Sequence, residues 1–303
     1  MRLNFLVNHI VGGWEPTDIR LGGTERGIQE WAEELVRKGH EVYVFRNGHK
    51  NSGMQVHGGV IYQERSTYHG HGDICINVKS PEQVPLEPTI FYTNNTDADQ
   101  LDLSKYSAVI QISEWAKDNI SVNNPKVYVV PHGYEPLKIY PETKIKNQCL
   151  YASSPDRGLE TLLRIWPKVI AAHPDATLKV TYGAPEYDVE GVEFLGNVDE
   201  ETMNQLYRES DYWTYPCNGG ELQCITGMKA QAAGCIPVII PVMALQETVK
   251  NGYFATADNY AEVLIDAMSK DNTEIQDALV MEHYPTIEES TNRLLEIIKQ
   301  VLH

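Results

Sequence analysis

Residues 215–239 read YPCNGGELQCITGMKAQAAGCIPVI. The stretch begins at the end of an apolar strand, turns at Asn218-Gly219-Gly220, continues as a helix from about Ile225 to Ala233, and ends in the apolar strand Ile236–Ile240. Asn and Gly favour tight turns because they tolerate positive φ angles. A strand, a helix and a second strand in this order predict two parallel strands with the helix packed on their sheet.

The same alternation extends upstream through the second half of the chain. Strands are predicted at Cys149–Ser153, Leu178–Tyr182, Val192–Leu195 and Tyr212–Tyr215, and helices at Asp156–Ala172 and Glu200–Glu209. Alternating strands and helices predict a parallel sheet that helices cover on both faces.

The first half begins with a βαβ pattern. LNFLV (Leu3–Val7) and EVYVF (Glu41–Phe45) are β-rich, and the segment between them has a helical apolar stripe, with Thr24 as its expected N-cap and Gly39 just past its end. Further strands are predicted at Val60–Gln63, Ile74–Val78, Thr89–Tyr92, Ala108–Ile112 and Val127–Val130. A polar, proline-containing linker near Tyr134–Asn147 separates the two halves.

Composition excludes some classes of partner. The chain has 25 basic and 42 acidic residues and a formal net charge of −17, which argues against nucleic acid, because nucleic-acid binding requires clustered Lys and Arg. No long apolar run and no basic amphipathic helix stands out, so membrane contact is unsupported, and because MRLNFLVNHI lacks the pattern of a leader, we expect an unprocessed protein. Five cysteines without a C-x-x-C pair or zinc spacing favour a reduced, cytoplasmic protein.

Three segments at predicted strand ends are candidates for ligand binding, because ligands of such sheets bind beyond the carboxyl ends of the strands. In LGGTERG, Gly22 and Gly23 precede a helix whose N-terminal N–H groups could bind an anion. The alternative is a tight turn that only enters the helix.

In YASSPDRGLETLL, Arg157 follows a strand and could hold a phosphate through its forked donors. The alternative is a first-turn arginine paired with Asp156 or Glu160.

The third segment is residues 215–239, which contain the Asn218-Gly219-Gly220 turn. Its turn presents Glu221, and Gln223, Cys224 and Ile225 open the following helix, so that their backbone N–H groups could face an anion. Lys229 lies a turn further along and either faces the same pocket or is solvated.

These segments together resemble the retaining GT-B glycosyltransferases of family four over nearly the whole chain. The resemblance rests on LGGTERG, KGHEVYVF, ISEWAKDNI, VPHGYE, SSPDRGLETLLRIWPKVIAAHPDATLKVTYG, VEFLGNVDEETMNQLYRESDYWTYP and the Glu221 segment, which follow the order and spacing of the family. It implies an α/β fold of two Rossmann-like domains whose parallel sheets face a central cleft. The implied parts are an acceptor-side domain (1–140), a nucleotide-sugar domain (141–285) and a C-terminal helix (286–303) that packs back on the first domain.

By the same resemblance, the chain transfers a hexose-type sugar from a UDP- or GDP-linked donor to a glycan, lipid-linked or small-molecule acceptor, with retention of configuration and without cofactor or metal. Glu221 and Arg157 are then the catalytic residues. The implied donor-binding residues are Gly22, Gly23, Ser153, Arg157, Tyr182, Gly196, Asn197, Glu221, Gln223, Cys224, Ile225, Thr226 and Lys229, and the implied acceptor-side residues are Asn94, Asn95 and His132.

The sequence also departs from the family pattern. Lys229 replaces a second glutamate that usually contacts the ribose, Ala152 replaces a basic residue, and Asn94 or Asn95 replaces a histidine. A lysine cannot accept hydrogen bonds from a diol. A non-catalytic nucleotide- or glycan-binding protein of the same fold is therefore the alternative, and an epimerase or phosphorylase is a third interpretation. Asp97-Ala98-Asp99 has the D-x-D form of a metal motif, a short pattern with frequent chance matches.

Overall fold

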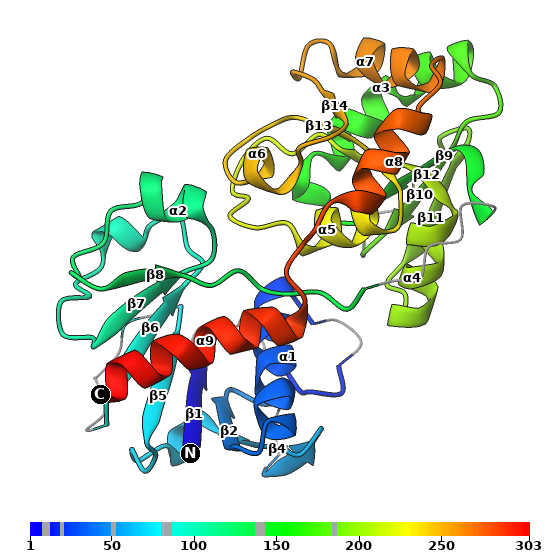
Figure 1. Cartoon of the computed structure of the whole chain (residues 1–303). Coiled ribbons are helices and arrows are strands. Elements are labelled where there is room, and N and C mark those ends of the chain that lie inside the picture. The colour runs from blue at the N-terminus through cyan, green and yellow to red at the C-terminus, as the bar shows by residue number, and fades with distance from the viewer. Residues whose placement is uncertain are drawn as a thin grey trace. The chain divides into compact units, whose positions relative to one another are not determined.

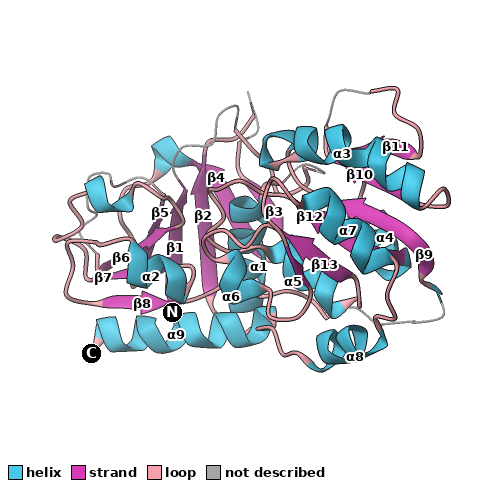
Figure 2. Cartoon of the chain, turned by 90° about the horizontal axis from the view of Figure 1, so that it is seen from above, coloured by secondary structure: helices cyan, strands magenta, loops and turns pink. Residues whose placement is uncertain are grey.

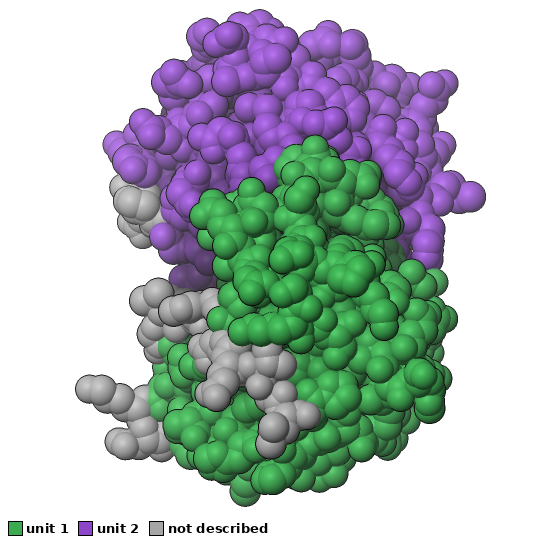
Figure 3. Space-filling model, turned by 90° about the vertical axis from the view of Figure 1, so that its left-hand side faces the viewer, with its two compact units in different colours: residues 1–133, 285–303 green, residues 134–284 purple. Residues whose placement is uncertain are grey.

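The computed structural model describes residues 1–7, 13–18, 21–49, 53–79, 81, 87–136, 143–183 and 187–303 (Figure 1). The chain forms two compact units, which Figure 3 shows in different colours. Unit 1 comprises Met1–Gly133 and Pro285–His303, and unit 2 comprises Tyr134–Tyr284. The sequence places these divisions at 140/141 and 285/286, and residues 137–142 of its linker lie outside the described part.

Unit 1 is built on an eight-stranded sheet. The strand order is β3-β4-β2-β1-β5-β6-β7-β8, and every pair is parallel except β3–β4. The strands are β1 (Arg2–Val7), β2 (Glu41–Arg46), β3 (Gln55–His57), β4 (Val60–Glu64), β5 (Ile74–Val78), β6 (Thr89–Thr93), β7 (Ala108–Gln111) and β8 (Val127–Val129). The sequence missed β3, because this strand is short and gains its partner through the Gly58-Gly59 turn, where both φ angles are positive.

The helices of unit 1 are α1 (Gly23–Arg37), α2 (Glu114–Asn119) and α9 (Ile287–Leu302), with 3-10 turns η1 (Arg65–Thr67) and η2 (Ala98–Gln100). The predicted N-cap of α1 is wrong: Gly22 holds that position, and the Thr24 hydroxyl instead accepts a hydrogen bond from Asn94. Gly39 follows the helix with φ +84°, as expected of a helix end. Helix α9 begins in a capping box and lies beside α1, where Trp31 Nε1 donates to Ser290 Oγ at 2.7 Å (Figures 1 and 2).

Unit 2 contains a six-stranded parallel sheet. Its strands follow the order β11-β10-β9-β12-β13-β14. They are β9 (Ile145–Tyr151), β10 (Thr177–Thr181), β11 (Val192–Gly196), β12 (Ser210–Tyr215), β13 (Ile236–Ile239) and β14 (Tyr253–Phe254). The predicted parallel sheet is confirmed, although β9 begins four residues before the expected Cys149.

The helices of unit 2 are α3 (Leu159–Ala172), α4 (Glu200–Glu209), α5 (Ile225–Ala232), α6 (Leu245–Thr248), α7 (Tyr260–Met268) and α8 (Thr273–Met281). The predicted helix start at Asp156 is wrong. Pro155–Arg157 forms a separate 3-10 turn, η4, because Gly158 adopts φ +104° and interrupts the helical path before α3.

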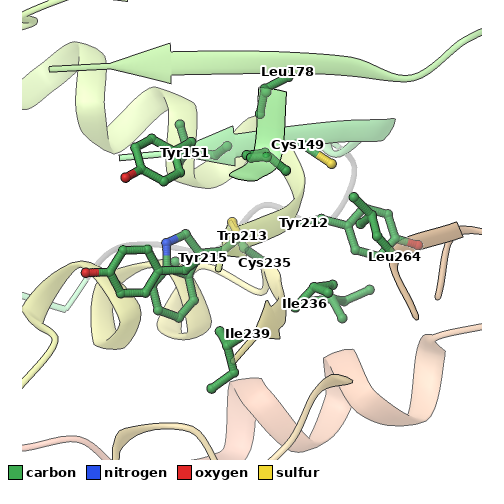
Figure 4. Packing of buried hydrophobic residues seen from close by; sticks show 14 of the residues in the cluster. Cys149, Tyr151, Leu178, Tyr212, Trp213, Tyr215, Cys235, Ile236, Ile239 and Leu264 are labelled. Carbon is green, nitrogen blue, oxygen red and sulfur yellow. The ribbon is translucent and has the colours of Figure 1, made fainter. Parts of the chain in front are cut away.

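The core of unit 2 lies between this sheet and its helices (Figure 4). Trp213 of β12 is fully buried and stacks on Tyr215 with ring centroids 5.2 Å apart. Gly227 of α5 fits against this indole, since a Cβ there would lie 2.7 Å from Trp213 Cη2. The core thus fixes the end of β12 and the first turns of α5. Among the described residues, no helix has the length and apolar character that crossing a bilayer requires.

Candidate active site

The strand order of unit 2 contains a topological switch point between β9 and β12. The chain proceeds outward from β9 through β10 and β11 on one side, and then returns to β12 on the other side of β9. All these strands are parallel, so the segments after β9 and after β12 leave the same edge of the sheet. In doubly wound sheets, the ligand crevice lies at this position. Unit 2 therefore has its expected ligand site between residues 152–158 and residues 216–224.

These two segments touch each other directly. Gly158, which ends η4, packs so closely on the segment after β12 that an added Cβ would lie 2.2 Å from the backbone oxygen of Pro216. Arg157 Nη1 donates a hydrogen bond to the backbone oxygen of Gly219 at 2.9 Å. The predicted alternative, in which Arg157 pairs with Asp156, is present only as a weak contact of 3.9 Å. The main partner of the guanidinium is therefore the turn that carries Glu221.

Hydrogen bonds hold both the side chain and the backbone of Glu221. Its Oε2 accepts a hydrogen bond from the Tyr215 hydroxyl at 2.8 Å, and its backbone oxygen accepts one from Ala244 N at 3.1 Å. The Tyr215 hydroxyl also lies 3.4 Å from Ser153 Oγ. Ser153, Tyr215 and Glu221 thus form a chain of contacts across the switch point.

Burial and the neighbouring groups shift the pKa of Glu221 in opposite directions. Burial raises the pKa of this carboxyl, whereas the hydrogen bond from Tyr215 and the nearby Arg157 lower it, leaving the pKa above its ordinary value. For Arg157, burial would lower the pKa, but Tyr215 and Glu221 raise it above its ordinary value. The guanidinium therefore stays charged beside a partly buried carboxyl.

The predicted segment 223–226 lies at the start of α5. Cys224 is the N-cap, and its Sγ accepts a hydrogen bond from Gly227 N at 3.4 Å. Ile225 and Thr226 form the first helical residues, and the Thr226 hydroxyl contacts Tyr207. N–H groups in the first turn of a helix have no partner within the helix, so this end can bind an anion.

Lys229 lies further along α5 and turns toward α4. Its Nζ is 3.7 Å from Glu200 Oε1, and its side chain is 14% exposed. The alternative of an ordinary solvated lysine is therefore wrong, because most of the side chain is covered and its ammonium has a carboxylate neighbour.

The remaining predicted donor residues of unit 2 follow β10 and β11. Tyr182 has φ +78° and is half-exposed, and Gly196 has φ +64°. An added Cβ on Gly183 would lie 3.4 Å from Asn197 Nδ2, so the two segments are neighbours. The structure thus places all the predicted donor residues of unit 2 at the ends of neighbouring strands or on α5.

In unit 1, the predicted residues gather at the start of α1 and the end of β6. Gly22 is the N-cap of α1 and Gly23 its first residue, and Asn94 Nδ2 donates a hydrogen bond to Thr24 Oγ1 at 2.5 Å. Asn95 Nδ2 donates to the backbone oxygen of Lys79 at 3.1 Å. The glycine loop and the asparagine pair therefore share one edge of the unit 1 sheet.

The expectation that His132 borders a binding site is not met. His132 is 1% exposed, its Nε2 lies 2.8 Å from the Tyr92 hydroxyl, and its ring packs on Trp31 with centroids 4.5 Å apart. Burial lowers the pKa of His132 to about 3. The physical reason for the misplacement is that Gly27 of α1 lets the helix approach the imidazole closely and cover it.

The D-x-D residues Asp97 and Asp99 flank the start of η2 and are exposed. Within the described ranges, no three His, Cys, Asp or Glu side chains come together as a possible metal site.

Sequence reasoning missed the role of Tyr215. The residue ends the strand that precedes the Asn-Gly-Gly turn, and this position at a strand end could have marked it as a candidate site residue. That its hydroxyl reaches Glu221 depends on the path of the turn. The positive φ angles of Gly219 (+152°) and Gly220 (+75°) bend this turn back over the strand end.

Comparisons with known proteins agree with this geometry. Residues 147–270 match the family model described as glycosyl transferases group 1. A phosphatidyl-myo-inositol mannosyltransferase of Propionibacterium freudenreichii is 36% identical over 85 residues, which cover 28% of this chain and 22% of that protein. The corresponding enzyme of Mycolicibacterium smegmatis is 30% identical over 106 residues, covering 32% and 28%. The matches thus span less than a third of the length of these relatives.

Solved structures show the fold over the whole chain. Sucrose-phosphate synthase from Thermosynechococcus elongatus has a TM-score of 0.72 at 13% identity and covers 99% of this chain and 98% of that one. Anabaena HepE in complex with UDP and glucose has a TM-score of 0.72 at 13% identity, covering 98% and 99%. The chain therefore has the GT-B fold of two Rossmann-like domains and resembles the family-four glycosyltransferases, a likeness carried in sequence by residues 147–270.

Proposed function

We propose that this protein is a glycosyltransferase that moves a hexose-type sugar from a UDP- or GDP-linked donor to a glycan, lipid-linked or small-molecule acceptor. The observation that carries the proposal is the meeting of Arg157 and Glu221 at the switch point of unit 2. The fold class supports it, as does the match of residues 147–270 to glycosyl transferases group 1. The relatives supply the first donors to test, because HepE was solved with UDP and glucose and a trehalose-6-phosphate structure with UDP-2-fluoro glucose.

In this proposal, the residues of unit 2 stabilise the leaving group. The bond between the anomeric carbon and the phosphate oxygen breaks, and its electron pair stays on the diphosphate. The charged Arg157 and the N–H groups at the start of α5 stabilise that negative charge where it develops. Glu221 positions the donor sugar by accepting hydrogen bonds from its hydroxyl groups.

Retention and metal independence belong to the same proposal. The acceptor oxygen attacks the anomeric carbon from the face that the phosphate leaves, and the acceptor proton passes to the departing phosphate oxygen. This route requires neither a second carboxylate nor a metal ion, because a guanidinium and a helix N-terminus provide the positive potential.

A two-stage experiment tests the proposal. Thermal unfolding is first measured with UDP, GDP, ADP and their sugar conjugates, since a ligand at 100 times its dissociation constant stabilises a protein by about 2.7 kcal/mol. Sugar release or transfer from the donor that binds is then followed for the wild type and Glu221→Gln, with and without EDTA. We expect wild-type turnover that EDTA leaves unchanged and a loss in Glu221→Gln of about 100-fold or more.

The configuration of the product completes the test. Proton NMR of the first product formed shows whether its anomeric configuration matches that of the donor. A product of opposite configuration contradicts retention, and loss of activity in EDTA contradicts metal independence. The absence of any nucleotide effect on unfolding contradicts the proposal as a whole.

The ion pair of Lys229 with Glu200 favours a second candidate, a nucleotide- or glycan-binding protein without transferase activity. A lysine held by a carboxylate offers a sugar diol no acceptor. This candidate predicts that a nucleotide sugar stabilises the protein, and that wild type and Glu221→Gln show the same negligible turnover. The turnover measurement described above separates the two candidates.

A further inference from the structure

The Tyr215 hydroxyl lies beside Glu221 but takes no part in the proposed steps of the reaction. The side chain is 1% exposed and comes from the last residue of β12. Its oxygen lies 2.8 Å from Glu221 Oε2 and 3.4 Å from Ser153 Oγ, two residues on the opposite sides of the switch point. One buried phenol therefore contacts both segments that form the expected ligand site.

The direction of the two hydrogen bonds follows from the chemistry of the groups. Burial raises the pKa of Tyr215 far above the neutral range, so the phenol keeps its proton. An ionised carboxylate only accepts hydrogen bonds, so the phenol donates to Glu221. The phenol oxygen can then accept from the Ser153 hydroxyl. The hydrogen bonds thus run from Ser153 through Tyr215 to Glu221.

Such an arrangement acts on the charge state of the carboxylate. A hydrogen bond donated to a carboxylate favours its ionised form, and it is stronger than a bond between neutral groups. Besides Tyr215, the backbone N–H of Gln223 and the nearby Arg157 also favour the ionised form of the partly buried Glu221, although the guanidinium itself donates to the backbone of Gly219. The other titratable group that faces Glu221 is the thiol of Cys224, whose pKa burial raises, so that it stays neutral.

We infer that Tyr215 is a positioning residue that holds Glu221 ionised and in a fixed orientation, with Ser153 supporting the phenol from the other side of the switch point. The inference rests on the proposed function for its effect on sugar transfer, but its effect on the proton of Glu221 is independent of turnover. Tyr215 itself need not touch the substrate, because it acts through the carboxylate.

A direct titration tests the proton effect. Protein with ¹³C-labelled Glu carboxyl groups is titrated by NMR as wild type, Tyr215→Phe and Ser153→Ala, and Glu221→Gln identifies the Glu221 signal by its loss. We expect Tyr215→Phe to raise the titration midpoint of Glu221 by roughly one pH unit, because a hydrogen bond to a charged group is removed. Ser153→Ala should move it in the same direction by less. An unchanged midpoint in Tyr215→Phe overturns the inference.

Tyr212→Phe is the matched control. Tyr212 is a buried phenol on the same strand, and its hydroxyl donates to the backbone oxygen of Ala267, away from Glu221. Each Phe variant loses the two hydrogen bonds of its phenol, which for Tyr212 include one accepted from Asn272 Nδ2, so both should unfold more easily. Only Tyr215→Phe should move the Glu221 midpoint. An equal shift in Tyr212→Phe would show a general effect of destabilisation and would also overturn the inference.

Turnover provides the second measurement. With the donor that binds, Tyr215→Phe should lower kcat on the order of tenfold while the donor KM changes little, and the acid limb of kcat/KM should move to higher pH. In a Glu221→Gln background, Tyr215→Phe should have no further effect on the pH profile. If no donor supports wild-type turnover, the proposed function fails, and the NMR titration still decides the role of Tyr215. If Tyr215→Phe retains the wild-type pH profile, the positioning role fails while the transferase assignment stands.

Discussion

The guanidinium of Arg157 donates a hydrogen bond to the backbone oxygen of Gly219, with an N···O distance of 2.9 Å. This bond connects the turn after β9 to the turn after β12 and places a fixed positive charge beside the segment that carries Glu221. A guanidinium has five N–H donors, so a bond to one carbonyl leaves others for a phosphate. The contact is therefore compatible with both a structural and a ligand-binding role.

Replacing Arg157 separates these two roles. In Arg157→Gln, the charge that stabilises the departing diphosphate is lost, and we expect kcat/KM for the donor to fall by about 100-fold. Steady-state kinetics and the thermal shift with UDP measure the effect. Arg164→Gln is the control, since Arg164 is an exposed residue of α3. Values for Arg157→Gln within twofold of those of the control would exclude a direct role in transfer.

Gly220 should tolerate no side chain. It has φ +75°, and an added Cβ would lie 2.6 Å from Arg157 Nη1. Gly220→Ala therefore combines backbone strain of about 1–3 kcal/mol with displacement of the guanidinium. Gly39→Ala has the strain without the collision, because Gly39 has φ +84° and no atom within 4 Å of the added Cβ. We expect thermal unfolding to show a loss in both variants but turnover to fall in Gly220→Ala alone. Full activity of Gly220→Ala would contradict the packing described.

The buried His132 should make the protein sensitive to acid. Its pKa is about 3 in the folded state because of burial, against about 6.5 in an unfolded chain. Between these values the unfolded state binds the proton and the folded state does not, so stability is complete above pH 6.5 and is lost as the pH falls toward 3. The slope is about 1.4 kcal/mol per pH unit. Urea denaturation at pH 7, 6 and 5 measures it, and His132→Gln should show a shallower dependence. Equal slopes in the two proteins would show that other groups cause the acid sensitivity.

Replacing a glycine of α1 by alanine should change stability in opposite directions at two positions, Gly23 and Gly27. Gly27→Ala places a Cβ 2.2 Å from His132 Cε1, whereas Gly23→Ala meets no atom within 4 Å. Alanine favours the helix by up to about 1 kcal/mol over glycine, and this gain decides the outcome at Gly23. At Gly27, overpacking against the imidazole should outweigh it and cost about 1–3 kcal/mol. Thermal unfolding of the two variants tests the difference, and a stabilised Gly27→Ala would show that the imidazole can move aside.

Much of the fold was predictable because its signals are local. The alternation of apolar strands and helix-length segments predicts the parallel sheet of unit 2, and α4 has the predicted bounds Glu200–Glu209 because Asp199 caps its first turn. The errors have causes that lie far away in the sequence. Thr24 is a good N-cap residue, but Gly22 is the N-cap of α1, and the Thr24 hydroxyl is held by Asn94, a residue remote in sequence. Likewise, the contact of Gly158 with Pro216 separates η4 from α3 and depends on a distant strand.

For the candidate site, the residues at strand ends can be identified from the amino-acid pattern, because strand periodicity and turn residues mark those positions. Glu221, Arg157 and Ser153 were found in this way. Which of them meet follows from the three-dimensional fold, because the order of strands in the sheet places β9 beside β12 although many residues separate them in the chain. The fold likewise brings the Tyr215 hydroxyl to Glu221 and buries His132 in the core. A hydrogen bond and the exclusion of water depend on distances in space, which a one-dimensional pattern does not contain.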